Sequence, residues 1–172
     1  MQKTTVRRLG ALLATAAILV AACGDDDKKS EDTTTTAAAA GGVTCDGVKL
    51  AFIGALSGDN GALGTNMING AQVAIDEFNT ANPDCQVEFD TSYDSQGDPA
   101  QATPLADQIV NDAAIIGLIG PGFSGETKAT MPKFEEAGLP MITPGATNAL
   151  LSTNGWTMFH RILANDDKQA PG

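Results

Sequence analysis

The chain has 172 residues, a length that suits one ordinary domain and a tail better than two domains. Ten basic residues against 21 acidic ones give a formal net charge of −11, which disfavours nucleic acid as a partner and unassisted binding to an anionic membrane. One histidine and three widely spaced cysteines exclude a zinc knuckle, a redox Cys-x-x-Cys pair and a histidine-rich metal site. We therefore predict neither a metal nor a cofactor.

Residues 1–22 predict a secretory signal. Three basic residues open the segment, an apolar run spans 9–20, and small residues precede Cys23. The apolar run is too short to make a good membrane span. The ending Leu-Val-Ala-Ala-Cys at 19–23 resembles the lipobox of bacterial lipoproteins, in which the signal is cut before the cysteine and Cys23 is lipidated. The alternative is ordinary secretory cleavage with an incidental cysteine.

Residues 23–43 predict a flexible spacer. From Gly24 to Gly42 the side chains are small or polar, so no apolar burial offsets the entropy of ordering them. A folded domain is expected over 44–163, followed by a short polar stretch at 164–172.

Strands and helices are predicted to alternate through the folded domain. Helical spacing of apolar residues predicts one helix from Met67 to Phe78, one that begins at Asp98-Pro99, and one over 125–137. Pro104 implies that the second helix either starts late or kinks. Short apolar runs predict five strands, at 48–53, 87–93, 115–119, 139–143 and 157–163. The second alternates polar and apolar residues, as edge strands do; the third is uniformly apolar, which predicts the sheet centre with helices on both faces.

This alternation predicts an α/β fold with a parallel, doubly wound sheet in a three-layer α/β/α arrangement. If the first and third strands are neighbours, the loops that follow them open at the topological switch point of the sheet. Those loops are 56–64 and 120–125, and the loop after the fourth strand, 143–148, adjoins them. The three loops are therefore expected to line one crevice.

Two of these loops bring a hydroxyl residue, Ser124 or Thr147, to the crevice. We expect Ser124 to cap the helix 125–137, with Glu126 in its first turn, so that the positive end of the helix faces both hydroxyls. Such a site suits a carboxylate. The alternative is that Ser124 only caps a helix and Thr147 only closes a turn.

Five segments resemble the periplasmic leucine/isoleucine/valine-binding proteins: 51–58, 69–76, 93–99, 109–112 and 142–148. These are the substrate-binding components of branched-chain amino acid ABC importers, and they have the type I periplasmic-binding-protein fold of two α/β lobes joined by a hinge. The resemblance implies that the chain holds the leader, the spacer and the first lobe (44–163), and that 164–172 form the hinge and the start of a second lobe. It also implies that late segments of the family's chain complete the cover of the first lobe's sheet.

The resemblance implies a binding protein rather than an enzyme. It would be lipid-anchored at the extracytoplasmic face of the cell membrane and would deliver a branched-chain or related amino acid to an ABC importer permease. The positions that match the family's ligand contacts are Ser124, Gly145, Ala146 and Thr147, with Leu63 as a pocket wall and Asp166 near the ligand at the hinge. The alternative is a sensor domain of the same fold that reports amides, urea or other amino acids to a signalling partner.

The family's first-lobe cysteine pair is replaced here by Gly97 and Phe123. Because Cys45 and Cys85 precede two strands that lie side by side in this fold, we expect them to form a disulfide that closes about 41 residues. The alternative is two free buried thiols.

An enzyme is disfavoured by the motifs as well. Residues 54–64 contain neither G-x-G-x-x-G nor a Walker lysine motif. Nothing in the sequence places His160, the sole histidine, near Ser124 as a catalytic base. His160 and Trp156 are expected to pack in the apolar interior.

Overall fold

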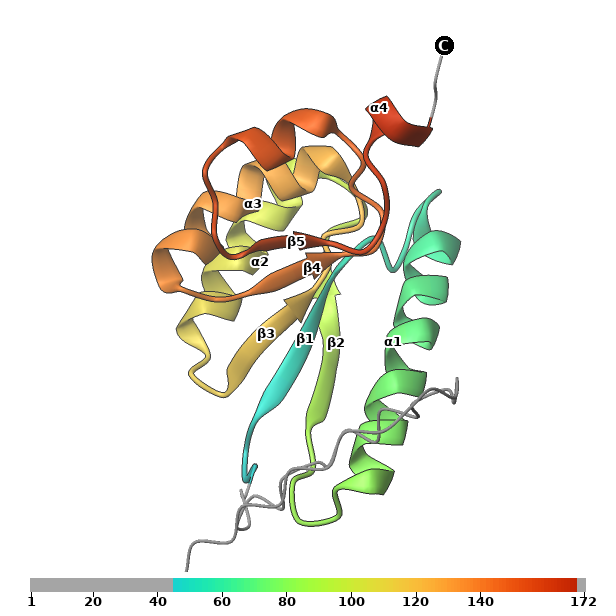
Figure 1. The fold of residues 1–172 in the computed structure, drawn as a ribbon, viewed down its shortest axis with the longest axis vertical. Helices are drawn as coiled ribbons and strands as arrows, with labels where there is room; N and C mark the ends of the chain where they lie inside the picture. Colours follow the sequence, from blue (N-terminus) through green and yellow to red (C-terminus); the bar gives the residue numbers. More distant parts are fainter. Residues whose placement is uncertain (1–44, 170–172) are drawn as a thin grey trace, which may run out of the picture. The chain divides into compact units, whose positions relative to one another are not determined.

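The structure is a computed structural model and describes residues 45–169. The predictions for the signal, for Cys23 and for the spacer up to residue 43 lie outside the described residues. Five strands form one parallel sheet in the order β2-β1-β3-β4-β5 (Figure 1). The strands are β1 (Lys49–Gly54), β2 (Glu88–Asp94), β3 (Ile115–Ile119), β4 (Met141–Thr143) and β5 (Phe159–Arg161).

This order confirms the predicted doubly wound sheet. The alternating strand β2 lies at the edge, and the apolar strand β3 lies at the centre. Strands β1 and β3 are neighbours although α1, β2 and α2 separate them in sequence, so the switch point falls between them, as expected.

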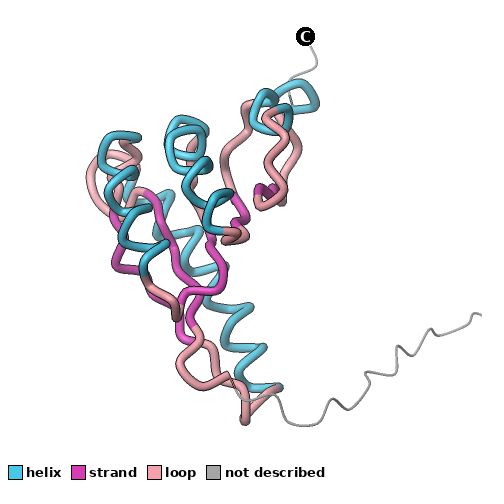
Figure 2. Tube along the Cα trace, turned by 90° about the vertical axis from the view of Figure 1, so that its left-hand side faces the viewer, coloured by secondary structure: helices cyan, strands magenta, loops and turns pink. Residues whose placement is uncertain are grey.

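The helices cover the two faces of the sheet unequally. Helix α1 (Gly61–Ala81) lies on one side, whereas α2 (Pro99–Asn111) and α3 (Ser124–Ala137) lie together on the other (Figure 1, Figure 2). A short 3₁₀ helix, η1 (Ala149–Thr153), and a short α4 (Asp166–Gln169) complete the chain. The buried core joins the sheet to α2 and α3 and includes Ile53, Leu118, Met141, Ala106, Ile109, Met131 and Phe134.

On the α1 side, the centre of the sheet is only partly covered. The side chain of Ile116 on β3 is 51% exposed and that of Ile142 on β4 is 37% exposed. The prediction of helices on both faces of the central strand is therefore wrong on this side among residues 45–169, because α1 lies toward the edge strand β2 instead (Figure 1).

Helix α1 begins earlier than the sequence predicted, so the first loop is shorter than 56–64. The N–H of Gly61 donates to the carbonyl of Gly58, and the N–H of Leu63 donates to the carbonyl of Asn60, so the helix begins at Gly61. A Cβ at Gly64 would lie 1.7 Å from the carbonyl oxygen of Ala55. Glycine is therefore needed for the first turn of α1 to pack directly against the end of β1.

Several local predictions also need correction. Helix α2 begins at Pro99, capped by the Asp98 side chain, so Pro104 lies inside it rather than delaying its start. His160 was expected to pack in the interior, but it is exposed on the edge strand β5. Trp156 does pack against the core, with its ring edge-on to Phe159 at 6.3 Å between centroids.

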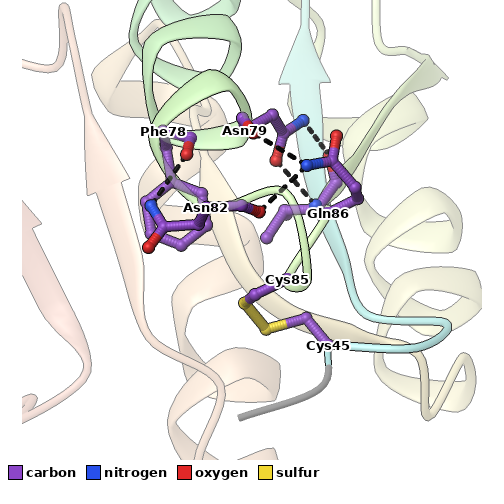
Figure 3. Close-up of a disulfide and its surroundings, with 7 residues drawn as sticks. Cys45, Phe78, Asn79, Asn82, Cys85 and Gln86 are labelled. Carbon is purple, nitrogen blue, oxygen red and sulfur yellow. Dashed lines mark hydrogen bonds between the residues drawn. A yellow bond between two sulfur atoms is a disulfide. The ribbon is translucent and has the colours of Figure 1, made fainter. Parts of the chain in front are cut away.

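A disulfide joins Cys45 to Cys85 where the chain enters β1 and β2 (Figure 3). Their Cα atoms lie 4.4 Å apart, and the bond links positions 40 residues apart in sequence. The Asn79 side chain holds the adjoining turn, because it accepts the N–H of Val87 at 2.8 Å and donates to the carbonyl of Val87 at 3.0 Å. The end of α1 and the start of β2 are thus fixed to each other next to the disulfide.

Candidate ligand-binding site

The predicted role of Ser124 as a helix cap is wrong. Phe123 occupies the N-cap position, and Ser124 is the first residue of α3. Among residues 45–169, the Ser124 hydroxyl makes no hydrogen bond to the N–H groups of its own helix. The carboxylate of Glu126 instead accepts the Phe123 N–H at 3.2 Å and a hydrogen bond from the Ser95 hydroxyl. The Ser124 hydroxyl is therefore available for a partner outside its own helix.

That partner lies in the predicted loop 143–148. The N–H of Asn148 donates to Ser124 Oγ at 3.1 Å, which brings the start of α3 and the turn 145–147 together. Within residues 45–169, the N–H groups of Ser124, Gly125 and Glu126 have no hydrogen-bond acceptor, as is normal for the first turn of a helix. The carboxyl edge of the sheet thus presents one hydroxyl and three N–H groups next to this turn.

Thr143, at the end of β4, fixes the shape of the turn. Its buried hydroxyl donates to the carbonyl of Pro121 at 2.6 Å and accepts the N–H groups of Gly145 at 3.2 Å and Ala146 at 2.9 Å. This one side chain ties the loop after β3 to the loop after β4. The sequence analysis did not single it out, because nothing in the local pattern shows that Thr143 faces Pro121.

Gly145 is required for the close approach of the same two loops. A Cβ at this position would lie 2.5 Å from the carbonyl oxygen of Gly122 and 2.9 Å from the terminal methyl of Met67. Any larger residue would separate the loops.

The turn 145–147 leaves three of its polar groups open. In the part of the chain that the structure describes, the carbonyl of Gly145, the N–H of Thr147 and the hydroxyl of Thr147 make no intramolecular hydrogen bond. Ala146 offers less, since its methyl group is fully buried and its N–H is held by Thr143. The turn can therefore supply one donor, one acceptor and one hydroxyl to a small polar molecule.

Leu63 and Asp166 come from two different helices near the turn 145–147. Leu63 is 49% exposed in the first turn of α1, one helical turn before Met67, whose side chain lies beside Gly122 and Gly145. Leu63 therefore extends the same side of α1 beyond Met67. The N–H of Asp166 donates to the carbonyl of Thr147 at 2.9 Å, and the Asp166 side chain is exposed.

Gly97 and Phe123, the positions that match the family's cysteine pair, are neighbours in space. A Cβ at Gly97 would lie 3.2 Å from the Phe123 ring. The ring fills the room over the glycine and packs the loop after β2 against the start of α3.

Two carboxyl groups at this edge differ in their ionisation. Burial raises the pKa of Glu126 above its ordinary value, and the negative charges of Asp98 and Asp94 raise it further, against opposing hydrogen bonds from Ser95 and Phe123. Burial also acts to raise the pKa of Asp94, but hydrogen bonds from Ser57 Oγ and from nearby N–H groups outweigh it and lower the pKa. Asp94 thus holds the loop after β1 as an anion.

A hollow of about 320 Å³ lies beside Ser124, between α3 and η1. Its lining combines the polar groups of Ser124, Lys128 and Asn148 with the apolar side chains of Leu150 and Leu151. Over residues 45–169, no group of three or more histidine, cysteine, aspartate or glutamate side chains could hold a metal ion. No helix in that range is long and apolar enough to cross a membrane.

Open α/β sheets bind ligands at their switch point, where this sheet gathers hydroxyl and backbone groups. The fold is that of a lobe of the type I periplasmic-binding-protein class, as two similar solved structures show. The periplasmic binding protein family model matches residues 47–170, and the chain belongs to this family.

Known relatives match most of the chain. The leucine-specific-binding protein of Salmonella typhimurium is 35% identical over 134 residues, which cover 76% of this chain and 35% of that protein. Two solved structures are also similar: the branched-chain amino acid transporter substrate binding protein LivJ of Streptococcus pneumoniae in complex with isoleucine, and the leucine binding protein LivK of Thermotoga maritima. They superpose with TM-scores of 0.64 and 0.63 at 30% and 29% identity, over 70% and 71% of this chain and 34% of each of theirs.

The chain therefore spans about a third of the length of these relatives. All three are named as substrate- or ligand-binding proteins, which agrees with the prediction of a binding protein rather than an enzyme.

Proposed function

We propose that the protein is an extracytoplasmic substrate-binding protein of an ABC importer and that it binds a branched-chain or related amino acid at the carboxyl edge of its sheet. The observation that carries this proposal is the 3.1 Å contact between the Asn148 N–H and Ser124 Oγ, which joins two binding loops beside the open N–H groups of α3. The names of the relatives from Salmonella typhimurium and Streptococcus pneumoniae support the choice of ligand and importer.

In the proposed pose, the ligand carboxylate lies against Ser124 Oγ, the first N–H groups of α3 and the Thr147 N–H. The ligand ammonium group lies against the Gly145 carbonyl and the Thr147 hydroxyl. Leu63 borders the pocket, Ala146 supports the turn from within, and Asp166 lies at the rim. Backbone dipoles and hydroxyls thus recognise both charged ends of the amino acid.

The described residues supply only one wall of this site. Leu63 and Asn148 remain exposed, whereas small-molecule sites enclose about 70–90% of their ligand. If a second lobe contributes half of the binding free energy, a micromolar site of about −8 kcal/mol becomes a millimolar site of about −4 kcal/mol for this chain alone. We therefore expect weak but saturable binding of leucine.

An NMR titration of the ¹⁵N-labelled chain with leucine tests the proposal. We expect the amide signals of Gly125 and Thr147 to shift with a dissociation constant on the order of 1 mM. Ser124→Ala should weaken binding by about tenfold, because a hydrogen bond to a charged group is lost. Thr80→Ala removes a hydroxyl that bonds only within the far end of α1 and is the matched control.

Parallel titrations with urea and acetamide separate an amino acid site from the amide sensor of the alternative. Saturable shifts with either amide and none with leucine would overturn the importer proposal. Micromolar binding of leucine by this chain would overturn the division of the binding energy between two lobes.

We also propose that Cys23 carries the lipid anchor. The lipobox-like ending of residues 19–23 and the spacer composition that follows support this. In cells given radiolabelled palmitate, the native chain should take up label and sediment with membranes, and Cys23→Ala should lose both properties. A Cys23→Ala chain that remains in the membrane fraction would contradict the anchor.

A further inference from the structure

The guanidinium of Arg161, at the end of β5, lies behind the Thr147 turn. Its Nη1 donates to the carbonyls of Ala146 at 3.2 Å and Asn148 at 3.0 Å, and its Nη2 donates to the Ser152 hydroxyl at 2.5 Å. Its Cζ atom also lies 5.6 Å from the centroid of the Phe159 ring. One side chain thus connects the turn to η1 and to β5.

We propose that Arg161 is the positioning residue of the ligand site, and that it orients and polarises the Thr147 N–H for the ligand carboxylate without touching the ligand itself. This inference rests on the proposed function, since it names the residue that prepares one donor of that site.

The orientation follows from three successive peptide groups, all of which are fixed. Arg161 holds the carbonyl between Ala146 and Thr147. The second peptide, between Thr147 and Asn148, is held at both ends: its carbonyl accepts the Asp166 N–H, and its N–H donates to Ser124 Oγ. Arg161 also holds the carbonyl of the third peptide, which is that of Asn148.

Within residues 45–169, the first and third of these peptides have an open N–H, that of Thr147 and that of Ala149. The Thr147 N–H is the one that belongs to the turn beside Gly145, whereas the Ala149 N–H belongs to the start of η1. In a planar trans peptide the N–H points opposite to the carbonyl. Because Arg161 holds the Ala146 carbonyl on one side, the Thr147 N–H is aimed away from Arg161 on the other.

The polarisation follows from the charge of the guanidinium. A hydrogen bond from a cation to a carbonyl is stronger than one from a neutral donor, and it strengthens the dipole of the whole peptide group. The Thr147 N–H therefore becomes a better donor to an anion. In this way the formal positive charge of Arg161 assists the site through a peptide bond, in addition to the Lys128 side chain that lines the hollow beside Ser124.

The three acceptors also explain why arginine suits this position. Two of them, the carbonyls of Ala146 and Asn148, lie in the turn and the third, the Ser152 hydroxyl, lies in η1. A planar guanidinium offers several N–H groups in fixed directions, whereas a lysine ammonium is a single point on a flexible stem. Arg161→Lys should therefore keep the charge but not the orientation, and Arg161→Met should lose both.

The first test uses the full chain without ligand. In ¹H–¹⁵N spectra, we expect the Thr147 amide proton to shift upfield and its hydrogen exchange to accelerate about tenfold in Arg161→Met, with a smaller change in Arg161→Lys. The Gly125 amide should keep its position. Lys133→Met, which removes a positive charge that pairs with Asp107 and does not touch the turn, is the control and should leave the Thr147 amide unchanged.

The second test compares leucine with leucinamide, which keeps the ammonium group but has a neutral amide in place of the carboxylate. Arg161→Met should reduce the preference for leucine over leucinamide by about tenfold, and Arg161→Lys should reduce it less. A residue that only holds the fold together would weaken both ligands equally.

The outcomes are separable. An unchanged Thr147 amide, or equal losses for leucine and leucinamide together with a shifted Gly125 amide, would overturn the inference. If the native chain binds neither compound, the proposed function fails, and the ligand-free spectra still decide whether Arg161 sets the Thr147 N–H. If Arg161→Met does not fold, Ser152→Ala removes one of the three contacts and should move the Thr147 amide in the same direction by a smaller amount, and no movement would again overturn the inference.

Discussion

Thr143→Val should destabilise the protein strongly although it hardly changes the volume of the side chain. The substitution removes a buried hydroxyl that makes three hydrogen bonds, to the carbonyl of Pro121 and from the N–H groups of Gly145 and Ala146. Thr143, Pro121 and Ala146 are all buried, so water cannot easily replace the lost partner.

The magnitude follows from the cost of unpaired buried groups. A buried donor or acceptor that loses its partner costs about 1–3 kcal/mol. Gly145 is partly exposed and can reach water, so the Ala146 N–H and the Pro121 carbonyl dominate, and we expect a loss of about 3 kcal/mol in the free energy of unfolding. For a domain of about 125 residues this corresponds to a fall of about 12 °C in Tm.

Thr143→Ser is the matched control, because it keeps the hydroxyl and removes only the methyl group. Burial of one methyl group stabilises by about 1 kcal/mol, so Thr143→Ser should lose about a third as much as Thr143→Val. Urea unfolding followed by circular dichroism measures both variants. If Thr143→Val were as stable as Thr143→Ser, the hydroxyl would not hold the turn and the account of the site would fail with it.

Three further predictions concern pH, redox state and the exposed face of the sheet. Burial raises the pKa of Glu126 above its ordinary 4.5, so folding favours the protonated acid. The stabilisation that the protonated Glu126 gives is complete below pH 4.5 and is lost as pH rises through the raised pKa. Urea unfolding of Glu126→Gln across this pH range should lack that dependence. Reduction of the Cys45–Cys85 disulfide should lower the free energy of unfolding by about 4 kcal/mol in the chain-entropy model, and denaturant curves that coincide with and without reductant would contradict this. We expect the exposed apolar face around Ile116 to make the chain self-associate in sedimentation velocity, and we expect Ile116→Thr, at a side chain that is 51% exposed, to reduce this association and to leave Tm within about 2 °C. A native chain that stays monomeric, or association that the substitution leaves unchanged, would contradict this.

The sequence predicted the sheet because each strand carries its own signal. The uniformly apolar run at 115–119 is typical of a central strand, and the alternation of polar and apolar residues at 87–93 is typical of an edge strand; β3 and β2 occupy these positions. The start of α1 was missed for the opposite reason. Its glycines indicate a loop when taken alone, but Gly64 permits a helix that contacts the Ala55 carbonyl, and that contact exists only in the folded chain.

The site was predicted in outline and not in detail. Ser124 and Thr147 could be placed together, since the ends of neighbouring parallel strands meet at one edge. The bonds that shape the site join residues distant in sequence: Thr143 reaches Pro121 across 22 positions, Asn148 reaches Ser124 across 24, and Arg161 reaches Ala146 across 15. Local patterns carry no trace of such pairs, so the predicted cap at Ser124 was wrong and Thr143 and Arg161 went unnoticed.

The charge of the chain favours a ligand that carries both signs over one that is only negative. With a formal charge of −11, the protein repels an anion within a Debye length of about 10 Å at moderate salt. An amino acid zwitterion has no net charge and escapes this repulsion, while its carboxylate can still meet the N–H groups of α3 and Thr147. Its ammonium group is favoured by the same negative surroundings and by the open Gly145 carbonyl. A keto acid of the same shape keeps the carboxylate, which is repelled, and lacks the ammonium group, which is attracted. A site that works as proposed should therefore bind leucine and reject the keto acid.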